Sequence, residues 1–227
     1  TYYSKLSKSS ETTLEQIYHE LASEHQQEAI EKIVEFGRQL VSQGHLELLS
    51  LIESVTLDNL QPVLMAPLMQ LHGDILLMLG RFEQASSILE AASKAAKEAN
   101  LPVVYSEILG SQADIAMKQG QTDKALSSHK EALEVQVELG DAKGAARTYN
   151  NMGYLYRRKN NRAKALEAYS EVEAIISSDE TLLSAQIILG RALLDLGEVE
   201  RARKHAFEVF ERTDKADDML AHARAQA

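Results

Sequence analysis

The stretch Tyr149–Val172 reads YNNMGYLYRRKNNRAKALEAYSEV, and its small residues decide the fold. Gly153 and Ala165 stand among larger apolar residues that recur every three or four positions, a spacing typical of amphipathic helices. Asn160 and Asn161 interrupt this pattern, and an Asn just past a helix end readily adopts the left-handed conformation that ends the helix. We therefore predict two helices joined by a tight turn, which approach closely where the side chains are small.

The same arrangement recurs along the chain at intervals of 36, 40, 40 and 37 residues. The leading small residues, each followed by a helix break seven positions later, are Gly37, Gly73, Ala113, Gly153 and Gly190, and the breaks are Gly44, Gly80, Gly120, Asn160 and Gly197. No window alternates between apolar and polar residues as a strand would. A period of this size on a helical chain is typical of a solenoid. We predict an all-α solenoid of about five stacked helical hairpins.

Helix starts are marked by proline and aspartate. Pro62 and Pro102 fall where helices are expected to begin, and proline is tolerated in a first turn because its missing N–H would be unpaired there. Asp141 and Asp179 are predicted N-caps of the following helices.

We predict three regions along the chain. Residues 1–28 form an N-terminal helical cap or the end of a preceding module, residues 29–213 form the repeat array, and residues 214–227 form a C-terminal capping helix. The chain begins at Thr1 without a Met and stops at Ala227 inside a helical pattern. A piece of a longer protein is therefore expected.

Charge and composition exclude several classes of protein. The net charge of −10 argues against nucleic-acid binding, which needs a basic footprint. One segment, residues 142–166, departs from this balance because it contains seven Lys and Arg and no acidic residue; we call it the basic segment. The absence of Cys excludes disulfides and fits a reducing compartment, and no apolar stretch is long enough to cross a membrane. We predict a cytoplasmic protein with no membrane contact.

The hairpins resemble tetratricopeptide repeats (TPR). The best copy is similar to the family pattern W-x2-L-G-x2-Y followed by A-x3-F, and the matching residues are Tyr149, Met152, Gly153, Tyr156, Ala165 and Tyr169. The longer period, and Leu139-Gly140-Asp141 leading into a hairpin, resemble the subclass with repeats of about 40 residues. The resemblance covers roughly residues 30–213. It implies a right-handed superhelix that acts as a non-enzymatic protein–protein interaction scaffold, with a peptide or partner domain held in its concave groove.

A second resemblance concerns the start of the chain. Tyr2–Leu6, Ile17–Leu21 and Ala29-Ile30 are similar to a junction in STAND-type signal-transduction ATPases of the maltose-regulon-activator kind. There a winged-helix module leads into a helical-repeat arm. This resemblance implies the sensor or regulatory arm of a larger signalling or transcription-regulating protein. A domain that senses a small-molecule effector is the alternative.

In the TPR family, the first helix of each hairpin lines the concave face and holds the peptide. Carried over position by position, the predicted partner-binding residues are Gln70, Asp74, Glu107, Asp114, Arg147, Asn150, Tyr154, Arg157 and Arg191. An Asn amide can pair with an extended peptide backbone, and Arg can bind a carboxylate through two hydrogen bonds. An acidic peptide or domain is therefore the favoured partner. The competing interpretation is structural, because Arg157, Arg158 and Lys159 fall at a helix C-terminus, where cations are favoured in any case.

No pattern of residues indicates catalysis, a metal site or a cofactor. No two His stand in a metal-binding frame, and His129 takes an aromatic position of the repeat, so we expect it to pack. Tyr149 and Tyr156 are expected to pack as well. Met219 and Leu220 make the last helical segment apolar on one side, which suggests that it caps the last hairpin or associates with another copy.

Overall fold

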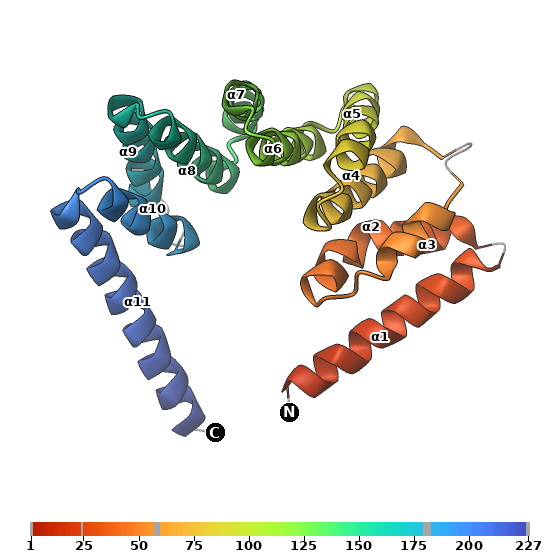
Figure 1. The fold of residues 1–227 in the computed structure, drawn as a ribbon. Coiled ribbons are helices and arrows are strands. Elements are labelled where there is room, and N and C mark those ends of the chain that lie inside the picture. Colours follow the sequence, from red (N-terminus) through yellow and green to blue (C-terminus); the bar gives the residue numbers. More distant parts are fainter. Residues whose placement is uncertain (1, 24, 57–59, 179–182, 226–227) are drawn as a thin grey trace. The chain divides into compact units, whose positions relative to one another are not determined.

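The computed structural model confirms the predicted all-α fold, since every regular element in the described residues is a helix and none is a strand (Figure 1). The description covers the backbone of residues 2–23, 25–56, 60–178 and 183–225, and it leaves out the side chains of residues 2–11, 178, 212 and 214–225. Within these ranges no helix combines the length and the apolar character that crossing a membrane requires.

The chain divides into two compact units after Gln121. The described helices of unit 1 are α1 (Tyr2–Leu21), α2 (Gln26–Ser42), α3 (Leu48–Ser54), α4 (Pro62–Met78), α5 (Phe82–Glu98) and α6 (Pro102–Lys118). Those of unit 2 are α7 (Thr122–Leu139), α8 (Ala142–Arg158), α9 (Arg162–Ser178), α10 (Leu183–Asp195) and α11 (Val199–Ala225). The predicted boundaries after residues 28 and 213 stay predictions. Helix α11 itself runs without a break across the second of them.

Consecutive helices pack as hairpins. The pairs α4/α5, α8/α9 and α10/α11 make the most extensive contacts, as the repeat pattern predicts. The hairpin at Gly37 is shorter, because its second helix, α3, has only seven residues. Helix α1 also packs against α2, the first helix of this hairpin. First helices of successive hairpins also contact one another: α2 with α4 and α4 with α6 in unit 1, and α8 with α10 in unit 2. Each unit thus has its own surface of adjoining first helices.

The turns between helices have the predicted left-handed residue. Gly80, with φ of 74°, donates its N–H to the carbonyl of Leu77, and the next residue, Arg81, donates to the carbonyl of Leu76 at 2.9 Å. These two bonds satisfy carbonyls that the helix end would otherwise leave unpaired. Asn160 has φ of 56° and fills the same role between α8 and α9, and every other predicted break also has a positive φ.

Helix starts follow the predictions wherever the structure describes them. Pro62 and Pro102 are the first residues of α4 and α6. The carboxylate of Asp141 accepts a hydrogen bond from the backbone N–H of Gly144 at 2.9 Å, so Asp141 is the N-cap of α8. Asp179 lies outside the described residues.

Small residues mark close contacts between helices, though not always within a hairpin. A Cβ atom added at Gly153 would lie 2.6 Å from Cζ of Tyr169, and one added at Gly73 would lie 2.6 Å from Cδ2 of Leu89. Both contacts join the two helices of one hairpin, as predicted. At Gly37 the closest side chain is instead Leu71 of α4, so there the small residue brings successive hairpins together.

Candidate functional site

The first helices of unit 1 bring four predicted site residues together. Gln70 of α4 donates a hydrogen bond to Oε2 of Glu107 on α6 at 3.2 Å. Arg38 of α2 binds both carboxylate oxygens of Glu107, with Nη1 3.0 Å from Oε1. Asp74 of α4 interacts electrostatically with Arg38, Glu107 and Asp114. These contacts connect α2, α4 and α6.

Asp74 is a carboxylate of this network whose pKa is shifted by its surroundings. Burial raises its pKa above the usual range; the hydrogen bond from Ser111 Oγ at 2.5 Å and the charge of Arg38 oppose this, while Glu107 and Asp114 add to it. Burial outweighs the favourable partners here, because an ionised carboxylate loses solvation that these contacts replace only in part. The network combines three carboxylates with one guanidinium and its bonds run between helices. It therefore holds unit 1 together and does not suit an acidic ligand.

In unit 2, the predicted site residue Asn150 has a buried side chain without a hydrogen-bond partner among the described residues. Asn150 on α8 is 4% exposed, yet neither its Oδ1 nor its Nδ2 atom has a hydrogen-bond partner in the described part of the chain. A buried polar group without a partner costs about 1–3 kcal/mol, so native proteins rarely keep one without a reason. The close contact of Gly153 with Tyr169 fixes α8 against α9, and with it the position of this amide.

Tyr154 lies one turn further along α8 and is 38% exposed. The guanidinium carbon of Arg157 is 5.5 Å from the centre of its ring and that of Arg158 is 6.0 Å from it, distances at which a cation is attracted to an aromatic face. Arg157 also donates to the carboxylate of Asp195 on α10 at 2.6 Å. Tyr154 therefore offers a partly exposed aromatic ring. The guanidinium groups of Arg157 and Arg158 lie near this ring, and the ion pair with Asp195 orients Arg157.

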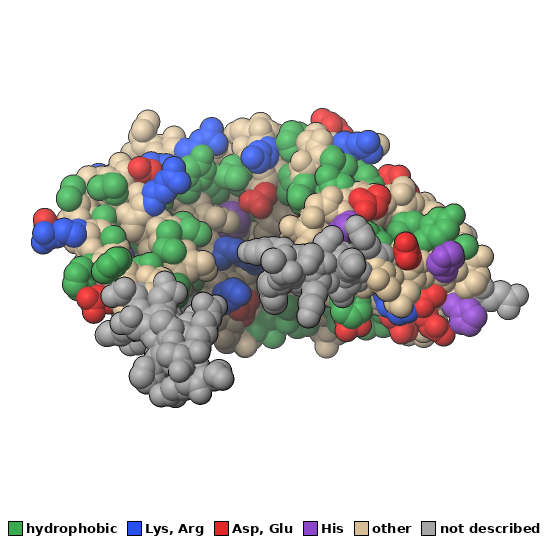
Figure 2. Space-filling view, turned by 90° about the horizontal axis from the view of Figure 1, so that it is seen from below, with side chains coloured by type: hydrophobic (Ala, Val, Ile, Leu, Met, Phe, Trp, Pro, Cys, Tyr) green, Lys and Arg blue, Asp and Glu red, His purple; other side chains and the backbone are tan. Residues whose placement is uncertain are grey.

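The basic segment is partly neutralised within unit 2. Three of its seven cations pair with acidic residues elsewhere in the unit; these pairs are Arg157–Asp195, Lys159–Asp123 and Arg162–Glu198. Arg147 and Arg191, the remaining predicted cations, are exposed on α8 and α10. Figure 2 shows acidic and basic side chains interspersed on the face that it displays. The seven Lys and Arg of the basic segment therefore give the surface less positive charge than their number predicts, because three of them are paired with acids.

These partners share a spacing that the sequence analysis did not use. Lys159 and Arg162 each lie 36 residues from their acid, and Arg157 lies 38 residues from its own. In unit 1, Gln70 and Glu107 are 37 residues apart. One repeat separates the members of every such pair, because equivalent positions of successive hairpins lie side by side. A search for complementary side chains one period apart would have found them.

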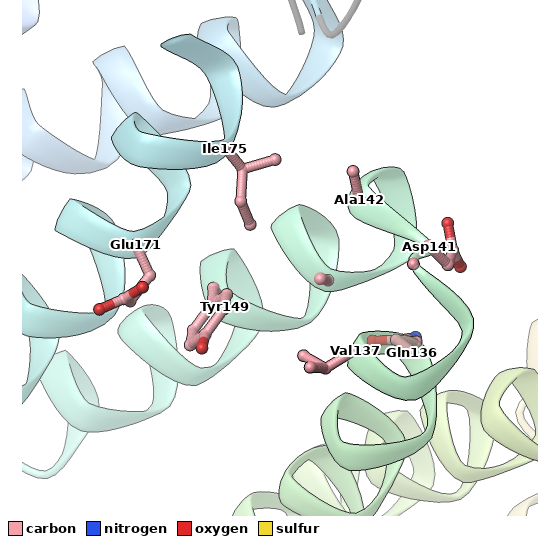
Figure 3. A pocket seen from close by; sticks show the side chains of 9 residues that line it. Gln136, Val137, Asp141, Ala142, Tyr149, Glu171 and Ile175 are labelled. Carbon is pink, nitrogen blue, oxygen red and sulfur yellow. The ribbon is translucent and has the colours of Figure 1, made fainter. Parts of the chain in front are cut away.

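A separate pocket of about 280 Å³ lies among α7, α8 and α9 (Figure 3). Val137 and Ile175 bound it on two sides and Tyr149 also lines it; Glu171 and Asp141 lie at its two ends, with their carboxylates turned outward. Burial, followed by the charge of Glu171, raises the pKa of Tyr149, so its phenol stays neutral and can donate a hydrogen bond. Tyr149 and Tyr156 also pack against the core of unit 2, as predicted.

His129 is 2% exposed, consistent with the predicted packing role. Among the described residues, no three His, Cys, Asp or Glu are grouped so that they could hold a metal ion.

Comparison with known proteins supports the helical-repeat fold. Residues 105–178 match the tetratricopeptide repeat family. No curated protein matches the chain in sequence.

Three solved structures of similar fold illustrate the resemblance. The first is a Podosopora anserina putative kinesin light chain with nearly identical TPR-like repeats, with a TM-score of 0.60 and 15% identity over 92% of this chain and 96% of that one. The second is the Rap conjugation gene regulator of plasmid pLS20 in complex with the Phr* peptide, with a TM-score of 0.64 and 18% identity over 93% of this chain and 57% of that one.

The third is a signal transduction ATPase with numerous domains from Pyrococcus horikoshii, which has a tetratricopeptide repeat sensor. Its TM-score is 0.68 at 15% identity, over 86% of this chain and 32% of that one, so the chain spans about a third of this protein. At these identities the likeness concerns the fold. The chain therefore contains tetratricopeptide repeats over residues 105–178, within a longer series of helical hairpins that has the TPR fold.

Proposed function

We propose that this chain is a non-enzymatic interaction scaffold whose first helices bind a peptide or partner domain. In this proposal it serves as the sensor or regulatory arm of a larger signalling or transcription-regulating protein. The observation that carries the proposal is the buried amide of Asn150, which has no partner in the described part of the chain. An extended peptide offers the complementary group at every residue, because its backbone N–H and C=O match the acceptor and donor of an Asn side chain.

The surroundings of Asn150 support a polypeptide ligand. Tyr154 provides a partly exposed ring on the same helix, which can cover the side chain of a bound peptide. Arg147 and Arg191 are exposed cations on α8 and α10 that could meet acidic side chains. We therefore assign the acidic character of the partner to unit 2. The predicted residues of unit 1, Asp74 and Glu107 among them, act in connecting helices.

Two of the similar structures are consistent with this role. The Rap regulator was solved with a peptide, and the ATPase from Pyrococcus horikoshii uses its tetratricopeptide repeats as a sensor. The TPR fold generally serves binding and not catalysis, and we assign this chain no reaction.

The test uses peptides selected from a random phage-displayed library on the wild-type chain. Their dissociation constants are then measured by calorimetry on the wild type and on Asn150→Ala. Loss of two backbone hydrogen bonds should weaken binding by roughly 10- to 100-fold, at about 1.4 kcal/mol per factor of ten.

Asn151→Ala is the matched control, because it removes the same side chain from the next position of α8. It should leave the dissociation constant nearly unchanged. Peptides that bind Asn150→Ala as tightly as the wild type would refute the assignment of this amide.

A second candidate is the sensing of a small-molecule effector. The observation that favours it is the pocket of about 280 Å³, which combines apolar walls with a neutral phenol and has the acidic residues Asp141 and Glu171 at its ends. A cationic metabolite with an apolar part would suit these groups. A metabolite that raises the melting temperature of the chain in a thermal-shift screen would favour this candidate over the peptide.

A further inference from the structure

Helix α11 carries two exposed aromatic side chains on one face. Phe207 is 62% exposed and Phe210 is 61% exposed, and they account for half of the four Phe in the chain. They are three residues apart on a helix, so they lie next to each other on its surface. Single exposed apolar residues are ordinary, but adjoining ones form a patch that can serve as a contact surface.

The repeat pattern indicates what kind of contact this face of α11 makes. The spacing of 37 residues that relates Gly153 to Gly190 and Ala165 to Ala202 also relates Ser170 and Glu173 of α9 to Phe207 and Phe210 of α11. The two Phe therefore occupy the positions that Ser170 and Glu173 hold one hairpin earlier.

In α9 those two positions bind the next helix. Arg201 of α11 donates to Oγ of Ser170 at 3.3 Å and to the carboxylate of Glu173 at 2.6 Å, and His205 lies 3.0 Å from the same carboxylate. Burial alone would raise the pKa of Glu173, but the hydrogen bonds from Arg201 and His205 hold it below the usual range. The equivalent face of α11 is thus a face on which a helix packs, with aromatic residues in place of the polar pair.

We infer that this face pairs with α11 of a second copy of the chain, in antiparallel orientation about a two-fold axis near the two Phe. The presence of two Phe on α11, where α9 has a Ser and a Glu, favours a contact between two identical helices. Ser170 and Glu173 need a partner with a matching Arg and His, whereas two Phe are complementary to themselves. Aromatic rings that meet across the axis add offset or edge-to-face contacts to the apolar area that they bury.

Charge sets the orientation of the pair. Lys204 and Glu211 lie seven residues apart, on the same flank of the Phe face and on either side of it along the helix. Antiparallel pairing brings Lys204 of one copy toward Glu211 of the other, twice per dimer. In a parallel pair related by a two-fold axis along the helices, the equivalent flanks would lie on opposite sides of the interface, so Lys204 and Glu211 would not meet. Lys204 is 73% exposed, and its contact with Glu208 is a loose one at 3.9 Å, so it can turn to a new partner.

The length of α11 leaves room for a partner. α11 has 27 residues and its hairpin partner α10 has 13, which corresponds to about 40 Å of helix against about 20 Å. The described residues of α10 therefore span about half the length of α11. This inference is independent of the proposed binding at Asn150.

Sedimentation equilibrium of the purified chain tests the inference. The wild type should associate reversibly to dimers in the micromolar range, and Phe207→Glu combined with Phe210→Glu should raise the dissociation constant by roughly a hundredfold or more, since each copy contributes both rings. Ile188→Glu is the matched control, because Ile188 is an exposed apolar residue of the same unit, at 54%, and does not line the pocket of about 280 Å³. It should dimerise as the wild type does. Circular dichroism checks that all variants keep their helices.

A charge exchange tests the orientation. Lys204→Glu alone should weaken the dimer several-fold, and adding Glu211→Lys should restore it. A wild type that stays monomeric would overturn the inference and leave the face to another protein or a further helix. Dimers that survive the Phe substitutions would overturn it too, because they would form through a different surface. Failure of the charge exchange to restore association would overturn the antiparallel arrangement.

Discussion

At the scale of single residues, His129 and Asn150 share one property. Each is buried and has at least one polar side-chain atom without a partner among the described residues. For His129 this burial changes its acid–base behaviour. Loss of solvation, and then the nearby charge of Arg147, lowers the pKa of His129 from 6.5 to about 4. The folded state therefore keeps this ring neutral where the unfolded chain would protonate it.

This difference predicts a pH dependence of stability. Between pH 6.5 and 4 the unfolded chain binds more protons at His129 than the folded one, so the free energy of unfolding falls as the pH falls. His129 should account for about 2 kcal/mol of the loss between pH 7 and pH 5. His129→Leu, which introduces the residue found at the equivalent position 89, should lose correspondingly less. Urea unfolding at the two pH values measures this, and equal losses in both proteins would contradict the lowered pKa.

At the scale of helices, the hairpin contact at Gly153 was predictable and the contacts between hairpins were not. Small residues and Asn or Gly breaks are local signals, so they located the helices and turns correctly. The partners of Glu107 and Arg157 depend on which faces of successive hairpins meet, and this follows only from packing. The sequence could likewise place Asn150 on a first helix, but its burial needed the structure.

The two helical glycines Gly153 and Gly190 give a matched test of close packing. Gly153→Ala should lower the free energy of unfolding by about 1–3 kcal/mol, because the new methyl group would overlap the ring of Tyr169. Gly190→Ala should raise it by about 0.5–1 kcal/mol, because its nearest neighbour would be His205 Cβ at an ordinary 3.6 Å and alanine favours helix. Urea unfolding of both variants provides the measurement. Effects of the same sign would show that the glycines are not distinguished by packing.

At the scale of the whole molecule, the repeat period predicted an all-α series of hairpins, and the structure confirms it. The division into two units was not predictable. It falls after Gln121, inside the hairpin predicted around Ala113, where the sequence pattern continues without interruption. Net charge was also a poor guide to the surface, since ion pairs one repeat apart consume three cations of the basic segment. Binding of a partner therefore depends on the polar and charged side chains that are not already paired between successive hairpins.

The central claim is that Asn150 is left unsatisfied by the fold and reserved for a partner, and the stability of Asn150→Leu tests it most directly. Leucine has a similar size and no polar atoms. If the amide is unpaired in the free protein, the substitution should leave the free energy of unfolding unchanged or raise it by about 1 kcal/mol, while capture of the selected peptides is lost. A decrease of 1 kcal/mol or more in urea unfolding would show that the fold itself satisfies this amide, and it would contradict the account.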